Sequence, residues 1–194
     1  MTLKELSDYL LINTNQYYIG AENIEVTPEV LKGISKRALS IYSNAKPKRY
    51  RKYNFKITKE ITNLFEIDNR EIVNILQIYM SDPVFFEVTV PFNWEYDVRN
   101  HILFAQMQGD VVIDFLVKPN LDDISYDDME FLNMVTGLYL MYIAEVRKGF
   151  KLDELPFSND ADELYSEGKE LFENTRDQIQ EETGGWYFAI KGLV

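Results

Sequence analysis

The hydrophobic pattern of this chain changes its period twice, and this limits the possible folds more than any other feature. Apolar residues recur with helical spacing near both ends, whereas between residues 53 and 117 they alternate or form short runs. Because a period of about 3.6 residues belongs to a helix and strict alternation to a strand, we expect helices, then strands, then helices. This order predicts an α+β fold, in which an N-terminal helix pair and a C-terminal helix pair flank a central antiparallel sheet.

Start and stop signals define the N-terminal helix pair. Thr2 and Glu5 have the spacing of a capping box, and the first helix is expected to end within residues 13–15. Thr27 followed by Pro28 predicts the start of the second helix, which ends before Pro47.

The C-terminal helix pair is predicted from two amphipathic segments. The first covers residues 126–148 and contains the longest apolar run, residues 131–144, which is shorter than the roughly 20 residues that span a bilayer. We therefore expect a buried helix. The second begins at Ser158 or Asn159, carries one apolar stripe and many charges, and is expected to lie on the surface.

The middle of the chain predicts four or five strands. Alternating or apolar segments occur at residues 53–57, 86–90, 102–107 and 111–117, and the glycine-containing loop before the last segment predicts a hairpin between the last two. Residues 72–79 are almost continuously apolar, which fits a strand or a short buried helix.

Length and composition indicate one globular domain. We expect residues 1–185 to form a single α+β domain and residues 186–194 to form an aromatic arm. The chain has no cysteine, which excludes disulfides and thiolate metal sites. Residues 1–11 carry charges within their apolar pattern, so no export signal is expected there.

The net charge of −12 is distributed unevenly along the chain. Residues 1–100 are balanced, whereas residues 101–194 carry the whole excess of acidic groups. Because like charges repel, this acidic half disfavours general binding of nucleic acid. It favours a basic partner surface, or a lumen through which DNA slides.

No motif for a catalytic nucleophile or a cofactor is present. The single histidine, His101, could act as a general base if Asp97 oriented it, but a partly exposed histidine at a strand end is the simpler interpretation. We expect no enzymatic activity and no cofactor.

Five carboxylates occur within nine residues, and hard cations bind such groups: Asp122, Asp123, Asp127, Asp128 and Glu130. Their spacing does not match an EF-hand loop. Because the dipole of a helix favours acidic residues at its start, we predict no metal site.

The chain has one basic cluster, interleaved with Tyr50 and Tyr53, and its members are Lys46, Lys48, Arg49, Arg51 and Lys52. It could contact nucleic acid, form a solvated loop, or pair with an acidic surface of a neighbouring subunit. The acidic second half of the chain favours the last interpretation.

Three aromatic residues, Trp186, Tyr187 and Phe188, follow two glycines near the end of the sequence. They could pack back on the domain or insert into a partner, where tryptophan and tyrosine are frequent anchors. We predict a docking arm.

Two short motifs resemble small virion structural proteins of tailed bacteriophages, specifically the neck or head-to-tail connector (adaptor) type. The first ends the second helix and comprises Tyr42, Ser43, Lys46 and Pro47; the second begins the last helix and comprises Leu164, Ser166, Glu167, Gly168, Lys169 and Glu170.

The resemblance implies a ring of identical copies around a DNA channel, assembled in the bacterial cytoplasm and incorporated into the virion. It implies binding to portal, neck or tail proteins, incidental contact with packaged DNA, no membrane, and a channel face that would include Asp122, Asp123, Asp127 and Asp128. The predicted sheet departs from all-helical connectors. A baseplate or tail-completion protein would explain the sheet as well. A metal-dependent nuclease or phosphatase and an acidic regulatory module are alternatives from other classes of protein.

Overall fold

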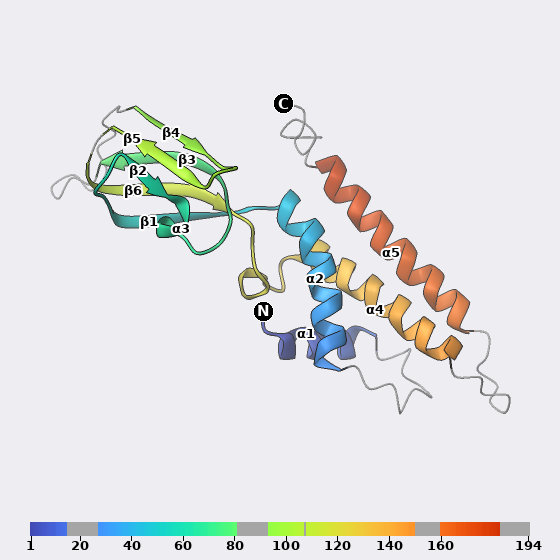
Figure 1. Cartoon of the computed structure of the whole chain (residues 1–194). Helices are drawn as coiled ribbons and strands as arrows, with labels where there is room; N and C mark the ends of the chain where they lie inside the picture. Colours follow the sequence, from blue (N-terminus) through green and yellow to red (C-terminus); the bar gives the residue numbers. More distant parts are fainter. Residues whose placement is uncertain (15–26, 81–92, 107, 150–159, 183–194) are drawn as a thin grey trace. The chain divides into compact units, whose positions relative to one another are not determined.

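The computed structural model describes residues 1–14, 27–80, 93–106, 108–149 and 160–182. The chain forms two compact units: a helical unit, Met1–Ala45 with Asn120–Val194, and a sheet unit, Lys46–Pro119. Helices occupy both ends and antiparallel strands the middle, which confirms the predicted α+β class (Figure 1). That residues 1–185 behave as one domain stays a prediction, and the predicted arm, residues 186–194, lies outside the described residues.

Four α-helices and one short 3-10 helix make up the described part of the helical unit: α1 (Leu3–Asn13), α2 (Pro28–Ala45), η2 (Leu121–Asp123), α4 (Met129–Gly149) and α5 (Asp160–Glu182). The predicted caps are confirmed. Thr2 Oγ1 accepts a hydrogen bond from Glu5 N–H at 3.2 Å, and Thr27 Oγ1 accepts one from Val30 N–H at 3.4 Å.

The start of α4 was predicted three residues too early. The helix begins at Met129 because residues 125–128 form a separate turn, in which Asp128 N–H donates to the Ser125 carbonyl at 3.2 Å. The predicted start of α5 at Ser158 or Asn159 lies outside the described residues.

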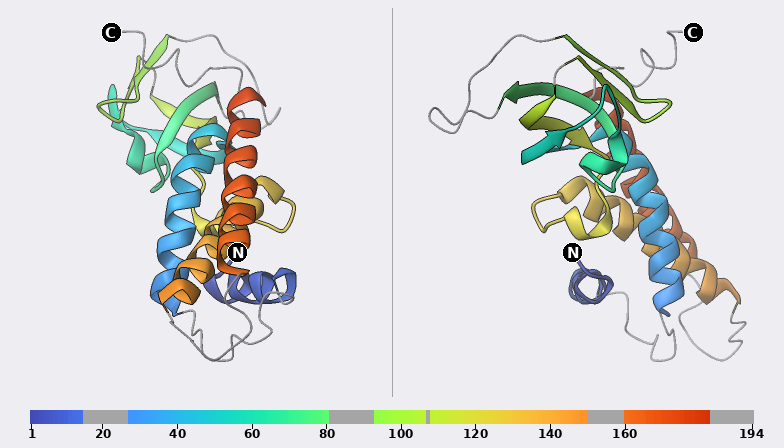
Figure 2. Two further views of the ribbon diagram at one scale, coloured as in Figure 1. Left: turned by 90° about the vertical axis from the view of Figure 1, so that its right-hand side faces the viewer. Right: turned by 60° about the vertical axis from the view of Figure 1, so that its left-hand side comes forward.

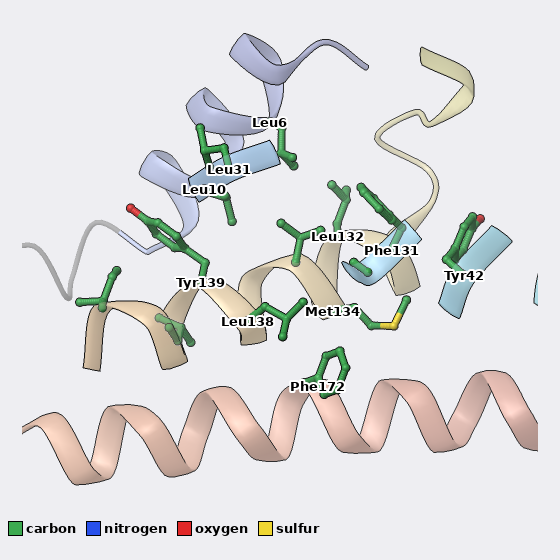
Figure 3. Packing of buried hydrophobic residues seen from close by; sticks show 14 of the residues in the cluster. Leu6, Leu10, Leu31, Tyr42, Phe131, Leu132, Met134, Leu138, Tyr139 and Phe172 are labelled. Atoms are coloured by element: carbon green, nitrogen blue, oxygen red, sulfur yellow. The ribbon is translucent and has the colours of Figure 1, made fainter. Parts of the chain in front are cut away.

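Helix α4 forms the centre of the helical core, as its long apolar run predicts. Figure 3 shows Leu6 and Leu10 of α1 reaching one side of α4, while Phe172 of α5 reaches the opposite side. Burial on several sides explains why few polar residues interrupt residues 131–144. None of the helices in the described ranges has an apolar stretch long enough to cross a membrane.

Two glycines allow α4 and α5 to pack very closely along their length (Figure 1). A Cβ atom added at Gly137 would lie 2.6 Å from the Gly168 carbonyl oxygen, and one added at Gly168 would lie 2.7 Å from the Gly137 oxygen. Both distances are shorter than van der Waals contact. The two backbones therefore touch at a point where no other residue type fits.

The sheet unit contains two three-stranded antiparallel sheets that pack face to face (Figures 1 and 2). The first sheet has the order β1-β6-β3 and the second the order β2-β5-β4. Their bounds are β1 (Lys48–Ile57), β2 (Ile61–Asn63), β3 (Ile72–Met80), β4 (Trp94–Asp97), β5 (Ile102–Ala105) and β6 (Gly109–Val117), and a single-turn helix, α3 (Leu64–Ile67), follows β2. Apolar side chains from both sheets form one core between them.

The strands differ from the prediction in number and in pairing: six described strands form two sheets, where four or five strands in one sheet were predicted. Strands β5 and β6 were expected to form a hairpin, but β5 pairs with β2 and β4, while β6 pairs with β1 and β3. The hairpin prediction was wrong because β6 is buried on both faces and occupies the centre of the first sheet. Residues 72–79 form a strand rather than a helix, and the predicted strand at residues 86–90 lies outside the described residues.

Substituting Gly137 by alanine is expected to destabilise the protein, because the new methyl group would push α5 away from α4. Overpacking of this kind costs about 1 to 3 kcal/mol, and for a chain of this length that lowers the melting temperature by several degrees. Thermal unfolding followed by circular dichroism measures the effect.

Gly33→Ala is the matched control, since a Cβ atom at Gly33 in α2 meets nothing within 4 Å. Alanine is favoured over glycine in a helix by up to about 1 kcal/mol, so this variant should melt at or above the temperature of the unmodified protein. A Gly137→Ala protein that also melts higher would contradict the close helix contact.

Candidate interaction surface

Strand β1 places the predicted basic cluster on an edge of the first sheet. It contains five basic residues and no acidic one, and among the described strands it pairs only with β6. The alternative of a solvated loop is wrong, since Lys48, Arg49, Arg51 and Lys52 lie within the strand. Lys46 lies two residues before it.

A buried carboxylate in the neighbouring strand holds two of these basic residues. Asp114 of β6 has a side-chain exposure of 0%, and its Oδ1 accepts a hydrogen bond from Arg51 Nε at 2.5 Å. Its Oδ2 accepts one from Arg51 Nη2 at 2.9 Å and one from Arg49 Nη2 at 2.5 Å. Hydrogen bonds from Arg51, and then from Arg49, hold the pKa of Asp114 below its ordinary value, although burial acts in the opposite direction.

This cluster lies on the outer face of the first sheet. Ile113 and Phe115, on either side of Asp114, belong to the core between the sheets, so Asp114 points away from that core. The register places Arg51 opposite Asp114 and Lys56 opposite Asp110 on the same outer face. The strand therefore presents several cations on one surface.

Two tyrosines flank the guanidinium group of Arg51. Its Cζ lies 6.0 Å from the ring centre of Tyr53 and 5.9 Å from that of Tyr79, distances at which cation–π attraction operates. Tyr79 in turn donates a hydrogen bond from its hydroxyl to Gln77 Oε1 at 2.7 Å. Arginine and tyrosine are enriched at protein interfaces, and Tyr53 is 61% exposed.

Lys52 points to the other side of β1 and has a local structural role. Its Nζ donates a hydrogen bond to the Ile67 carbonyl at 2.5 Å and lies over the ring of Phe55. This lysine therefore ties β1 to the short helix α3 and lies on the other side of the strand from Arg49 and Arg51. Its predicted role in an interface stays a prediction.

The negative charge of the protein is concentrated in the helical unit. The sheet unit contains ten basic and ten acidic residues, whereas the helical unit contains ten basic and 22 acidic ones. The net charge of −12 thus belongs entirely to the helical unit. A division of the sequence at residue 100 also gives one balanced part and one part with a net charge of −12, but the units assign that charge to a folded part of the protein.

Two of the five acidic residues between Asp122 and Glu130 act as local caps. Asp123 Oδ2 accepts a hydrogen bond from Asn120 N–H at 2.8 Å, and Asp128 Oδ2 accepts one from Ser125 N–H at 2.7 Å. Asp128 Oδ1 also accepts a bond from the Tyr42 hydroxyl at 2.6 Å; burial, and then Asp128, raise the pKa of Tyr42. In the described part of the chain, no group of three histidine or carboxylate side chains is arranged to hold a metal ion.

His101 lies in the turn between β4 and β5 and has a positive φ of 55°. Asp97 does not orient it, because both Asp97 oxygens accept hydrogen bonds from Asn100, which lower the pKa of Asp97. The imidazole instead packs against Phe65 with ring centres 4.7 Å apart, and its buried Nδ1 has no hydrogen-bond partner among the described residues. The arrangement in which Asp97 would orient His101 as a general base is therefore not formed.

Sequence reasoning missed Asp114, the residue that organises the basic cluster. One signal was available: an aspartate interrupts the apolar segment of residues 111–117, and two arginines at alternating positions could neutralise it. Trp186, Tyr187 and Phe188, the predicted docking residues, lie outside the described residues.

Comparison with known proteins does not identify a relative. No protein-family model matches the chain, and no curated protein matches its sequence. The arguments about function below therefore depend on the geometry and charge of the chain itself.

Replacing Asp114 by asparagine is expected to destabilise the sheet unit, because the two guanidinium groups lose their counter-charge. Hydrogen bonds to charged groups contribute about 1.5 to 3 kcal/mol, so we expect a loss of about 2 kcal/mol and a melting temperature lower by roughly 4 to 8 °C at neutral pH. Asp110→Asn is the matched control, since Asp110 lies in the same strand but is exposed.

The stability that Asp114→Asn loses should depend on pH in a defined direction. Because folding lowers the pKa of Asp114, its contribution is complete above the unfolded pKa of about 3.9 and disappears as the pH falls through the folded value. The melting temperatures of the unmodified protein and of Asp114→Asn, measured between pH 7 and about pH 2.5, should become equal below about pH 4. A difference that stays constant down to the lowest pH would contradict the charge-based explanation.

Proposed function

We propose that this protein is a non-enzymatic structural subunit of a tailed-phage virion, of the neck or head-to-tail connector type. Copies of it would form a ring that joins the portal to the tail. The observation that supports this proposal is the separation of charge between the two units, combined with an exposed basic edge strand. Such a distribution is suited to contact between subunits.

The charge separation favours assembly of identical copies in one direction. A basic surface on one unit and an acidic surface on the other attract each other between copies, whereas two identical surfaces repel. A contact between different surfaces of the same protein is heterologous, and repeated heterologous contacts generate closed rings when the rotation permits. This geometry is the one that a connector requires.

The acidic helical unit also suits a channel for DNA. Carboxylates repel phosphate groups, so a wall rich in them lets DNA pass without strong binding. We propose that Asp122, Asp123, Asp127 and Asp128 contribute to this wall. Of these, Asp122 and Asp127 are exposed, whereas Asp123 and Asp128 also hold local turns.

A second candidate is a baseplate or tail-completion protein. The sheet unit favours it, since the simplest connectors are all-helical and this chain devotes residues 46–119 to two packed sheets. Both candidates use the same surfaces for assembly and differ in the neighbouring protein that is bound.

Mixing the purified protein with the portal protein and with the tail proteins of the same phage tests the proposal. We expect negative-stain electron microscopy to show rings of the protein and a specific complex with the portal protein. A complex with tail or baseplate proteins alone would favour the second candidate. A protein that stays monomeric and binds none of them would contradict both, as would Mg²⁺-dependent hydrolysis of phosphoesters that Asp127→Ala abolishes.

A further inference from the structure

We propose that the exposed acidic side of α5 in one copy docks against the outer face of β1 in the next copy. This contact rests on the self-assembly that the proposed function requires, and it names the two surfaces that meet. The acidic stripe, as we call it, consists of Glu163, Glu167, Glu170, Asp177 and Glu181, all of them exposed.

The acidic stripe forms one line along α5. With about 3.6 residues per turn, its five residues fall within roughly 80° of one another around the helix axis, and with a rise of 1.5 Å per residue they extend over about 27 Å. The two basic residues of α5, Lys169 and Arg176, lie off this line, although Arg176 pairs with Asp177 at 2.8 Å. Lys148 pairs with Asp162, which is also off the line.

The opposite side of α5 is already occupied. Leu164, Gly168 and Phe172 face the helical core, and the tight contact at Gly137 fixes the rotation of α5 about its axis. The acidic stripe is therefore presented to solvent in a fixed orientation. A helix held in this way gives up little conformational freedom when it binds.

The first sheet carries the positive charge that the stripe needs. On the outer face, Arg49, Arg51 and Lys56 of β1 lie beside Asp110 and Asp114 of β6, and β3 has no charged residue. This leaves one positive charge in excess on that face, because Lys48 and Lys52 pair with core positions of β6 and lie on the other side of β1. Arg49 is 62% exposed even though it bonds to Asp114, and Lys56 is exposed on the same face. From Arg49 to Lys56 the strand extends over about 23 Å, close to the length of the acidic stripe.

A symmetric contact between two β1 strands is disfavoured. Pairing of this edge with its copy would bring ten basic side chains together, and cationic side chains are a known protection of edge strands. The strand is also irregular between Lys52 and Phe55, where Asn54 has a positive φ of 53°. The positive charge of this edge thus disfavours pairing with the same edge of another copy, whereas it favours contact with an acidic surface.

Charge reversal in two variants tests the contact. One variant carries Lys56→Glu on the outer face of β1, which leaves the arginines on Asp114 unchanged; the other carries Glu163→Lys and Glu170→Lys. Sedimentation velocity at low salt should show that each variant alone associates about tenfold more weakly than the unmodified chain, because its two surfaces now repel. An equimolar mixture should recover the association, since each reversed surface then meets an opposite one.

Two controls keep the test independent of folding. Asp8→Lys with Glu29→Lys changes the net charge by the same amount as Glu163→Lys with Glu170→Lys, but at exposed positions outside the acidic stripe. This control should leave the association unchanged. A chain that carries all three reversals should associate by itself.

Single variants that associate like the unmodified chain, or a mixture that fails to recover, would overturn the contact while leaving self-assembly standing. An unmodified chain that stays at its monomer mass of 22.8 kDa would overturn the self-assembly, and with it this contact.

Discussion

A buried carboxylate in the central strand of a sheet needs cationic partners, and Asp114 imposes this requirement on the sheet unit. Strand β1 satisfies it with Arg49 and Arg51 at alternating positions, which places both guanidinium groups on the outer face. Two cations then share one anion. The interaction that holds the edge strand to the sheet therefore also leaves positive charge at the surface, so stability and the proposed binding function have a common origin.

The helical unit has the complementary property for a different reason. Helix α4 is buried by its neighbours, and α5 needs only a narrow apolar line with Gly168 to pack against it. The remaining surface of α5 is free to carry carboxylates. Because the net charge of −12 lies entirely in this unit, the protein combines an acidic and a basic surface in one chain. We propose that this polarity directs its assembly.

The sequence predicts local features well and pairing poorly. The caps at Thr2 and Thr27 follow from neighbouring residues, so both helix starts were predicted correctly. The pairing of β6 with β1 and β3 depends on residues far apart in the chain, and a local turn signal suggested the wrong hairpin. The basic cluster was taken for a possible loop because lysine and arginine are not typical strand residues. Its place on an edge is visible only in three dimensions, and the same holds for its pairing with Asp114, although an aspartate within an apolar segment was a signal in the sequence.

The salt dependence of self-association tests the central claim most directly. Screening shortens the reach of exposed charges from about 10 Å at 0.1 M salt to about 3 Å at 1 M. If opposite charges on the two units drive assembly, the mass-average size measured by sedimentation should fall steadily towards the monomer as NaCl rises over this range. An assembly whose size stays constant or grows with salt would contradict the account, because an apolar interface would then hold the copies together.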